Sequence, residues 1–377
     1  MKKRKNPYII FVLLFCIFTL SITVQHTVSA DEFGTVPPVE ELYTIYSIHT
    51  NEALFESEYV EVGDQYVSKN NAWYEVISVD YDNYLAYAEF KAQFYLPTIT
   101  SETPEHTSTQ QVVGLYHTHN AESYVPTDGT DSIYGIGGIH DVGNALTLAL
   151  LQQNTIVYHN ETLHLPHNSS AYTRSRLTAQ SLLNTSPVPV AIFDIHRDAL
   201  PKSSYEVVLN DQSLSKIRIV VGKSNQSYSY NLEFALKIKA TSDNLYSGLI
   251  KDIYIGKNSY NQDLTNQALI FECGTYLIEK EAVIASMPLL ANVINETLFN
   301  VSGSGDIIIS DDITDNADIQ PATDTGITNT DTDLTIDTDL DATNSNHLKD
   351  NIKILVSVLF LVGIISLLMI VQKRRSR

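Results

Sequence analysis

Histidine and carboxylate side chains gather in three short stretches of this 377-residue chain. The first stretch holds His117, His119 and Glu122, the second holds His196, and the third holds Glu272. Zinc in hydrolases is typically bound by three His and Glu ligands, with a fourth position left open for water. His119-x-x-Glu122 followed by the distant His196 supplies such a set of ligands. Glu272 is then free to act as general base and acid. The pattern predicts a zinc-dependent hydrolase.

Several neighbouring residues could support these ligands. His117 and His119 would face the same side of a strand that continued through both. We favour His119, which begins the His-x-x-Glu, and keep His117 as a supporting residue or alternative ligand. A metal-bound histidine usually donates its other ring N–H to a carboxylate, and Asp194 and Asp198 flank His196. A single histidine at a strand end is as often a polar core residue, but the whole set would be costly to bury without partners.

The remaining titratable residues of this region have simpler interpretations. Cys273 directly follows an expected strand, which favours a small apolar core residue over a thiol nucleophile. The other histidines lie in expected loops or at helix starts, and we expect ordinary surface residues at His140, His159, His164 and His167.

Composition excludes several classes of protein. The chain has 24 Lys and Arg against 44 Asp and Glu, a net charge of −20, whereas a nucleic-acid-binding surface needs clustered basic residues. With 44% hydrophobic and 18% charged residues, the chain matches globular proteins. Its two cysteines are too few for a disulfide framework or a cysteine-based metal site.

The candidate residues follow apolar stretches that predict strands. Strands and helices alternate from residue 111 onward, which indicates βαβ units and an α/β fold with a mostly parallel sheet. Functional groups of such sheets collect at the carboxyl ends of the strands. We expect strands at Val112–Tyr116, Ile156–Tyr158, Val190–Ile195, Ile217–Val221 and Ala268–Phe271. We expect helices at Asp141–Leu151, Arg174–Leu183, Asn231–Ala240 and Glu279–Leu298.

A β-rich pattern precedes this region. Tyr and Val dominate short segments that are separated by turn residues, which is typical of strands. We expect these strands at Leu42–Ile48, Tyr59–Val62, Trp73–Val79 and Leu85–Phe90. Residues 97–110, rich in Thr, Ser and Pro, predict a linker to the α/β region.

Both ends of the sequence predict contact with a membrane. Basic residues, the apolar run Tyr8–Val24 and Val28-Ser29-Ala30 form a signal-peptide pattern, and we favour cleavage after Ala30 over a retained anchor. Ile354–Val371 carries no charge and precedes a basic tail, as in a transmembrane helix whose tail is cytoplasmic. Residues 301–350 hold twelve Asp and one Lys, which predicts a disordered, self-repelling stalk. The body between the two ends is therefore expected outside the cytoplasm, attached to the cell membrane.

The order of several motifs over residues 112–294 resembles the stage II sporulation protein P family. No single motif is specific, but the combination is. The motifs are Tyr116–Tyr124, Val142-Gly143 at the start of a helix, Tyr172 with Ser175, Asp194–Ala199, Val220–Gly222, Asn261–Leu264 and Phe271–Gly274.

The resemblance implies an activity and a fold. The family is similar to zinc-dependent N-acetylmuramoyl-L-alanine amidases, which cut the amide between the glycan strand and the stem peptide of peptidoglycan. The implied fold is a phosphorylase/hydrolase-like α/β sandwich, whose ligand order is similar to that of the zinc carboxypeptidases. Other zinc amidases take their Glu ligand from the first helix, but Asp141–Leu151 contains no Glu, which favours Glu122.

The resemblance also implies site residues and partners. Zinc is expected on His119, Glu122 and His196, with Glu272 as the catalytic carboxylate. Substrate contacts are expected at Arg197, Asn261 and Gln262. Implied partners are peptidoglycan, membrane lipid and the stage II sporulation proteins D and M. The stalk and C-terminal span depart from the family, so a sporulation role and vegetative wall turnover both stay open.

Two other functions stay compatible with these residues. One is a non-catalytic peptidoglycan-binding module on an amidase fold. The other is a zinc carboxypeptidase or endopeptidase that acts within the stem peptide. In every case we expect the same division of the chain: a signal or anchor at 1–30, a β-rich region at 31–98, the amidase-like domain at 99–300, the stalk at 301–350, a transmembrane helix at 351–372 and a cytoplasmic tail at 373–377.

Overall fold

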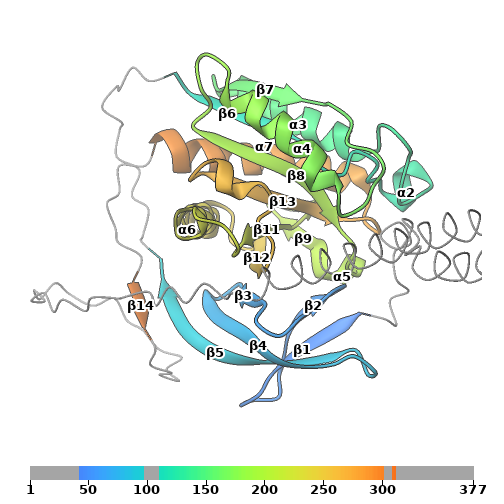
Figure 1. The fold of residues 1–377 in the computed structure, drawn as a ribbon, viewed down its shortest axis with the longest axis vertical. Helices are drawn as coiled ribbons and strands as arrows, with labels where there is room; N and C mark the ends of the chain where they lie inside the picture. Colours follow the sequence, from blue (N-terminus) through green and yellow to red (C-terminus); the bar gives the residue numbers. More distant parts are fainter. Residues whose placement is uncertain (1–41, 97–109, 301–307, 311–377) are drawn as a thin grey trace, which may run out of the picture. The chain divides into compact units, whose positions relative to one another are not determined.

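A mixed β-sheet of twelve strands connects the residues that the computed structural model describes, which are 42–96, 110–300 and 308–310 (Figure 1). Its strands follow the order β2-β1-β5-β4-β3-β12-β11-β13-β8-β6-β7, and β14 pairs with β5. A separate hairpin is formed by β9 and β10. The strands are β1 Tyr43–Ser47, β2 Ala53–Ser57, β3 Gln65–Val67, β4 Ala72–Asp80, β5 Leu85–Tyr95, β6 Val112–Tyr116, β7 Ile156–Asn160, β8 Ala191–Asp198, β9 Glu206–Leu209, β10 Gln212–Ser215, β11 Ile217–Gly222, β12 Ile250–Gly256, β13 Ala268–Thr275 and β14 Ile308–Ser310.

The half of the sheet that follows residue 110 is mixed. β7, β6, β8 and β13 run parallel to one another, as the alternation of strands and helices predicts. β11 is antiparallel to β13 and parallel to β12. After β8 the chain passes through the β9–β10 hairpin and enters β11. Parallel strands need a long crossover connection, usually a helix. The connection here is a hairpin instead, and β11 runs in the opposite direction to β13. The predicted α/β class is therefore confirmed with a mixed sheet, and the phosphorylase/hydrolase-like type of sandwich stays a prediction.

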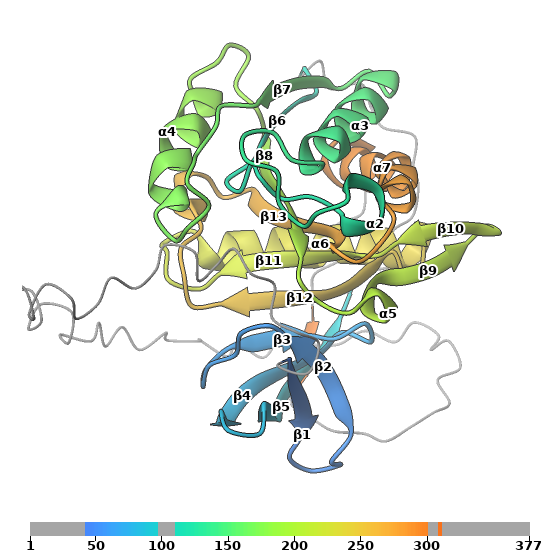
Figure 2. The same ribbon diagram turned by 90° about the vertical axis from the view of Figure 1, so that its right-hand side faces the viewer.

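Helices cover both faces of this half of the sheet (Figure 2). α3, α6 and α7 share a core with Leu115 and Phe271 on one face. On the opposite face, Ala179 of α4 packs with Tyr116 and Ile192. The apolar strands are buried on both sides, which explains their nearly continuous hydrophobic sequences. The helices are α2 Val125–Asp128, α3 Ile139–Gln152, α4 Ala171–Leu183, α5 Lys202–Tyr205, α6 Tyr228–Leu245 and α7 Lys280–Asn295, with short turns η2 Gln262–Leu264 and η3 Glu296–Asn300.

α7 belongs to the core. Within the described ranges, the stretch Lys280–Phe299 is the one helix long and apolar enough to cross a membrane. Its Val283, Met287 and Leu290 are fully buried among the side chains of the sheet and of α3. We therefore interpret this helix as a core helix of the α/β region.

The β-rich region differs from prediction at its second strand. The predicted strand at Tyr59–Val62 is wrong, and β2 lies earlier, at Ala53–Ser57. A turn replaces the predicted strand, because the backbone N–H of Glu61 donates to Asp64 Oδ2 at 2.8 Å and Gly63 adopts a φ of 91°. Side-chain acceptors of this kind offer the backbone an alternative to strand pairing.

The sheet continues from the β-rich region into the α/β region. β3 pairs antiparallel with β12, with Val67 opposite Ile253. β14, which lies within the predicted stalk, pairs antiparallel with β5, so strand structure extends past residue 300. The predicted segments at 1–30, 351–372 and 373–377, and the rest of the stalk, lie outside the described residues.

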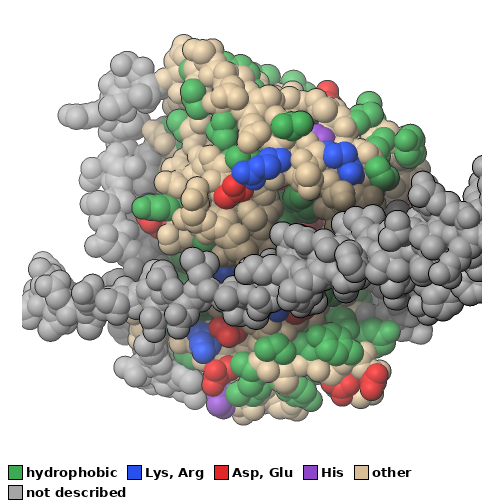
Figure 3. Space-filling model, viewed as in Figure 1, with side chains coloured by type: hydrophobic (Ala, Val, Ile, Leu, Met, Phe, Trp, Pro, Cys, Tyr) green, Lys and Arg blue, Asp and Glu red, His purple; other side chains and the backbone are tan. Residues whose placement is uncertain are grey.

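Charged side chains are scattered on the face that Figure 3 shows. Over the described residues of that face, Lys and Arg lie singly and mostly near Asp or Glu. Exposed ion pairs contribute little to stability. An example from α6 is the pair of Lys237 Nζ and Glu233 Oε1, which are 2.6 Å apart.

A buried ionic network lies where the two regions meet. Arg218 of β11 is 4% exposed, and it donates from Nε and Nη2 to the two carboxylate oxygens of Asp252 at 2.7 and 2.9 Å. Its Nη1 lies 3.1 Å from Asp198 Oδ2, and its Nη2 also reaches the carbonyl oxygen of Glu56 at 3.4 Å. One guanidinium thus holds the end of β8, β12 and the end of β2 together.

Arg218→Met should lower the free energy of unfolding by about 3–5 kcal/mol, because Asp198 loses the cation that pairs with it and Asp252 keeps only Lys251, whose Nζ lies 3.2 Å from Asp252 Oδ2. The matched control Lys237→Met removes an exposed cation and should change it by less than about 1 kcal/mol. Urea unfolding monitored by circular dichroism measures both. Equal effects of the two substitutions would contradict the structural role of the network.

The same network predicts a loss of stability in acid. Burial alone would raise the pKa of Asp252, but the charges of Arg218 and, to a lesser extent, Lys251 outweigh it and lower the pKa to about 2 from an ordinary 3.8. A carboxylate with a lowered pKa stabilises the fold above its unfolded pKa and loses that contribution as the pH falls through the folded one. Unfolding free energies measured between pH 4 and pH 2 should therefore fall more steeply for the wild type than for Arg218→Met.

Candidate active site

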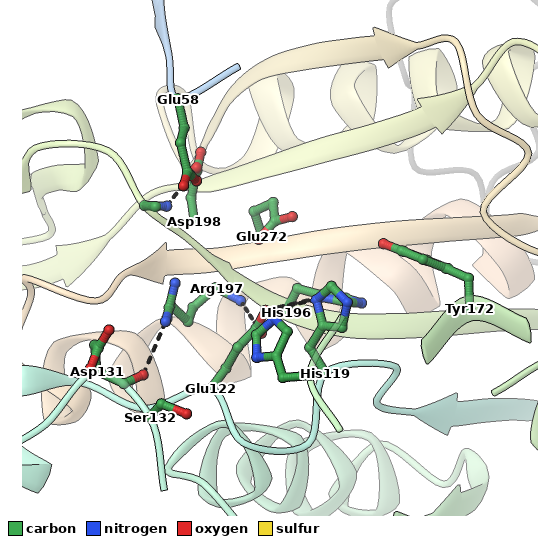
Figure 4. A pocket seen from close by; sticks show the side chains of 12 residues that line it. Glu58, His119, Glu122, Asp131, Ser132, Tyr172, His196, Arg197, Asp198 and Glu272 are labelled. Atoms are coloured by element: carbon green, nitrogen blue, oxygen red, sulfur yellow. Dashed lines mark hydrogen bonds and ion pairs between the residues drawn. The ribbon is translucent and has the colours of Figure 1, made fainter. Parts of the chain in front are cut away.

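Strand ends bring the predicted residues to one pocket (Figure 4). His196 and Arg197 lie near the end of β8, Glu272 lies on β13, and the loop after β6 contributes His119 and Glu122. These are the ends at which side chains of parallel strands meet. The three stretches that the sequence singles out therefore line one cavity.

Backbone register sets the relative positions of the two strands. In the parallel pairing of β8 with β13, Glu272 stands opposite His196. Asp194 of β8 accepts hydrogen bonds from the backbone N–H and the hydroxyl of Thr118, at 2.7 and 2.5 Å. These bonds attach the loop after β6, which carries His119, to the neighbouring strand.

Four donor groups line the pocket, and three of them, without His196, form a close cluster. Ligand atoms of His119, Glu122 and His167 lie within 4.8 Å of one another. Nδ1 of His119 is 3.2 Å from Oε1 of Glu122, and Nδ1 of His196 is 3.4 Å from the same oxygen. Two imidazoles thus face one carboxylate, and the third stacks on His119 with ring centroids 4.1 Å apart.

His196 is fixed by carboxylates on both sides. It is 2% exposed, and its Nε2 lies 3.0 Å from Asp194 Oδ1, although the pair lacks hydrogen-bond angles. Burial alone would lower the pKa of His196, but the charges of Asp194 and Glu122 outweigh it and hold the pKa well above its ordinary value. Asp194 therefore occupies the place of the carboxylate that orients a metal-bound histidine.

Glu122 is held as an anion. Its Oε2 accepts the backbone N–H of Arg197 at 2.9 Å, and the residue is 4% exposed. Burial opposes the charge, but His196 and His119 outweigh it and keep the pKa of Glu122 well below its ordinary value. Burial lowers the pKa of His119 and lowers that of His167 to about 4, so these two rings are neutral at physiological pH and their nitrogen lone pairs are available.

Glu272 differs from Glu122 in its surroundings. Its Oε2 is buried and has no hydrogen-bond partner among the described residues. Burial, opposed by His196 and reinforced by the negative charges of Asp198 and Glu122, raises the pKa of Glu272 to about 8. Two carboxylates in one pocket with pKa values shifted in opposite directions are suited to different chemical tasks.

The donor set fits zinc. Nε2 of His119 is buried without a hydrogen-bond partner among the described residues, as expected of a nitrogen that awaits a ligand. Imidazole nitrogens and a carboxylate oxygen are the donors that zinc prefers. Nδ1 of His119 and Nδ1 of His196 both lie near Oε1 of Glu122. His196, whose pKa is raised, must give up a proton before it can bind a cation.

His117 does not join this cluster. β6 ends at Tyr116, so the strand does not continue through His117 and His119, and the two rings do not share a side. Nδ1 of His117 donates to the carbonyl of Ile195 at 3.1 Å, and its Nε2 lies 2.9 Å from Nε2 of His159. Both ring nitrogens are occupied within the fold, so His117 is a structural residue.

Three further predicted residues lie apart from the donor cluster. Asp198 lines the pocket but pairs with Arg218 and accepts the hydroxyl of Tyr205 at 2.6 Å, so it does not orient His196. The amide of Asn261 donates to the Tyr172 carbonyl at 2.8 Å. Gln262 bonds the backbone of Val220 and Gly222. Neither amide is among the residues that line the pocket, and the expected substrate contacts of Asn261 and Gln262 stay predictions.

The expectation of four ordinary surface histidines is also wrong. His140 and His164 are each 2% exposed. Nδ1 of His164 donates to the carbonyl of His117 at 2.7 Å, and its Nε2 accepts the hydroxyl of Thr178 at 2.8 Å. His159 and His167 are partly buried, against His117 and His119 respectively. One feature of the sequence could have indicated that these histidines are not ordinary surface residues. The polar loop from His159 to His167 holds three histidines in nine residues.

Two more pocket residues were not predicted to belong to this site, although one of them, Tyr172, is part of a motif that carries the family resemblance. Glu58, from the turn after β2, and Tyr172, from α4, both line the cavity (Figure 4). Desolvation of its carboxyl group, together with the charge of Asp198, raises the pKa of Glu58 to about 7, although the residue as a whole is exposed. The ring of Tyr172 stacks on His196 with centroids 6.2 Å apart.

Gly143→Ala tests the structural role of His117. A Cβ at this position of α3 would meet His117 Nε2 at 2.6 Å and a ring carbon of His159 at 3.0 Å. Alanine normally stabilises a helix by up to about 1 kcal/mol relative to glycine, but overpacking here should instead cost about 1–3 kcal/mol. Denaturant unfolding measures the change, and a stabilised variant would contradict the packing around His117.

Comparison with known proteins identifies relatives. The family model for Stage II sporulation protein P matches residues 47–295. Stage II sporulation protein P of Bacillus subtilis strain 168 is 30% identical over 185 residues, which cover 45% of this chain and 46% of that protein, so the chain spans about half the length of this curated relative.

Solved structures with some likeness include two N-acetylmuramoyl-L-alanine amidases. Ami1 of Mycobacterium smegmatis is 13% identical with a TM-score of 0.32, over 50% of this chain and 94% of that one. The enzyme of Clostridium difficile 630 is 14% identical with a TM-score of 0.31, over 51% and 96%. We draw nothing further from likenesses of this size. Because the family model covers more than half of the chain, the protein belongs to the stage II sporulation protein P family.

Proposed function

We propose that this protein is a zinc-dependent N-acetylmuramoyl-L-alanine amidase that hydrolyses the amide between the glycan strand and the stem peptide of peptidoglycan. One observation carries the proposal. The unpartnered carboxylate of Glu272 lies in one pocket with His119, Glu122 and His196. A ligand set beside a free carboxylate is the arrangement that metal-assisted hydrolysis requires. Membership of the family supports the choice of peptidoglycan as substrate.

The residues that would hold zinc are His119, Glu122 and His196. When bound, zinc would polarise a water molecule and the amide carbonyl. Asp194 keeps the ring of His196 oriented toward Glu122, and the Arg197 backbone N–H fixes Glu122. These contacts hold the donors in place before a ligand arrives, which reduces the ordering that binding requires.

Glu272 is the proposed general base and acid. Its raised pKa, about 8, makes it a stronger base than an exposed glutamate, so it can take a proton from water and hold it. It then gives this proton to the alanine nitrogen that leaves the lactyl carbonyl. Because Oε2 has no partner among the described residues, no protein hydrogen bond must break for this transfer.

Arg197 is the proposed substrate contact. Its Nη2 donates to the carbonyl of Asp131 at 3.0 Å, and its guanidinium lies 5.6 Å from the centre of the Tyr276 ring. Its Nε is buried without a partner among the described residues. This N–H is suited to a carbonyl or carboxylate oxygen of the stem peptide.

Substitution of the two key residues should separate chemistry from metal binding. Glu272→Gln should lower the release of stem peptides from purified peptidoglycan by about 10²–10⁴-fold and still bind zinc at about one equivalent. His196→Ala should lose both activity and zinc, because catalytic sites need three protein ligands. Glu233→Gln and His49→Ala, at exposed positions, are the matched controls. Full activity of Glu272→Gln would refute its role.

Mass spectrometry of digested sacculi separates the candidate activities. Free, intact stem peptides are expected from an amidase. Shortened stems would indicate a carboxypeptidase or endopeptidase, and unchanged muropeptides would indicate a non-catalytic binding module. Either of these outcomes would replace the proposal.

We also propose that the protein works at the outer side of the cell membrane, beside stage II sporulation proteins D and M. The apolar stretch at 351–372 would attach it, with residues 301–350 as a spacer. Deletion of residues 351–377 should release active protein into the medium, since a membrane span would be lost. Enzyme that stays membrane-bound after the deletion would instead indicate an anchor at 1–30.

A further inference from the structure

The loop between β7 and α4 brings His167 into the pocket. Its ring stacks on His119 at an interplanar angle of 28°, and its ligand nitrogen lies within 4.8 Å of those of His119 and Glu122. The other donors come from the strand β8 or from the loop that directly follows β6. Among the described residues, His119, Glu122, His167 and His196 are the four donor groups of the pocket. His167 is the one of these four that lies on neither β8 nor the loop after β6.

Arg174 of α4 holds this loop in place. Its Nε donates to the carbonyl of His164 at 2.9 Å. Its Nη2 donates to the carbonyl of Pro166 at 2.5 Å and to Oδ1 of Asn168 at 3.0 Å. The acceptors lie on both sides of His167 in sequence, so one guanidinium fixes the backbone that presents the imidazole.

The structure places ligand atoms of His119, Glu122 and His167 within 4.8 Å of one another, and Nδ1 of His196 lies 3.4 Å from Oε1 of the same Glu122. If all four bound one zinc ion, they would exceed what a hydrolytic zinc site needs. Zinc bound by His119, Glu122, His167 and His196 would have four protein ligands, the closed arrangement of structural sites. Hydrolysis needs one position open to water. One of the four must therefore leave before the site can act.

His167 is the donor that is least fixed. His196 lies between Asp194 and Glu122, and Glu122 accepts the backbone N–H of Arg197. No hydrogen bond from another described residue reaches the ring of His167, which is held by stacking alone. Rotation about its side-chain bonds would release it without breaking a protein hydrogen bond.

We propose that His167 is an exchangeable fourth ligand that closes the metal site in the resting enzyme and leaves when substrate enters. The protein would then be latent until peptidoglycan occupies the pocket. This inference rests on the proposed zinc site, and it adds a means of regulation to it. Arg174 acts as a positioning residue, because it keeps the closing imidazole within reach.

Cobalt substitution of the full chain, purified in detergent, tests the inference with azide as the probe. Cobalt(II) absorption reports the ligand set, and an azide titration reports whether a position is open. If the closed state outweighs the open one by about ten to one, His167→Ala should bind azide about tenfold more tightly than the wild type. It should keep about one equivalent of cobalt, show an altered visible spectrum and release stem peptides faster.

Two further variants complete the experiment. Arg174→Gln leaves every donor in place but loosens the loop, so its azide affinity should lie between those of the wild type and His167→Ala. It also keeps the inference testable if His167→Ala does not fold. His49→Ala, at an exposed position, should behave as the wild type.

The outcomes distinguish this inference from the function on which it rests. Identical cobalt spectra and azide affinities for the wild type and both loop variants would overturn the role of His167. Loss of cobalt from His167→Ala, with retention by His196→Ala, would make His167 a permanent ligand and would also overturn it. A wild type that binds no cobalt would refute the metal site itself, and the inference with it.

Discussion

Parallel pairing of β8 with β13, in the register that sets Glu272 opposite His196, is the constraint on which the rest of the site depends. Successive side chains of a strand point to opposite faces, so a slip of one residue would carry either group to the other face of the sheet. The burial of Phe193 and Phe271, whose rings stack 5.0 Å apart in the core, makes such a slip costly. The packing of the hydrophobic core thus fixes the strand register that sets Glu272 opposite His196.

The pocket concentrates charges that would repel one another elsewhere. Glu122 stays ionised because two imidazoles and a backbone N–H surround it, whereas Glu272, one strand away from such donors, has a raised pKa. Buried groups keep their charge only where partners are present. The difference between the two carboxylates therefore follows from which neighbours the strand order supplies.

Sequence patterns located the strand ends and the groups on them, because apolar runs such as Val112–Tyr116 are long and the polar residues after them stand out. The predictions failed where local hydrogen bonds or the end of a strand determine the backbone conformation. The turn at Glu61 and Asp64 replaced a predicted strand, and the end of β6 at Tyr116 separated His117 from its neighbour. The predicted list of site residues was also incomplete. It lacked His167, which reaches the pocket only through the fold of a polar loop whose sequence has no periodicity.

The pairing of β3 with β12 has a practical consequence. A shorter protein that began at the predicted boundary near residue 99 would leave β12 as an edge strand with unpaired backbone groups. Such edges are templates for pairing with other chains and promote aggregation. Preparations of the α/β region alone should therefore be poorly soluble, and production of the protein for study should begin upstream of β1.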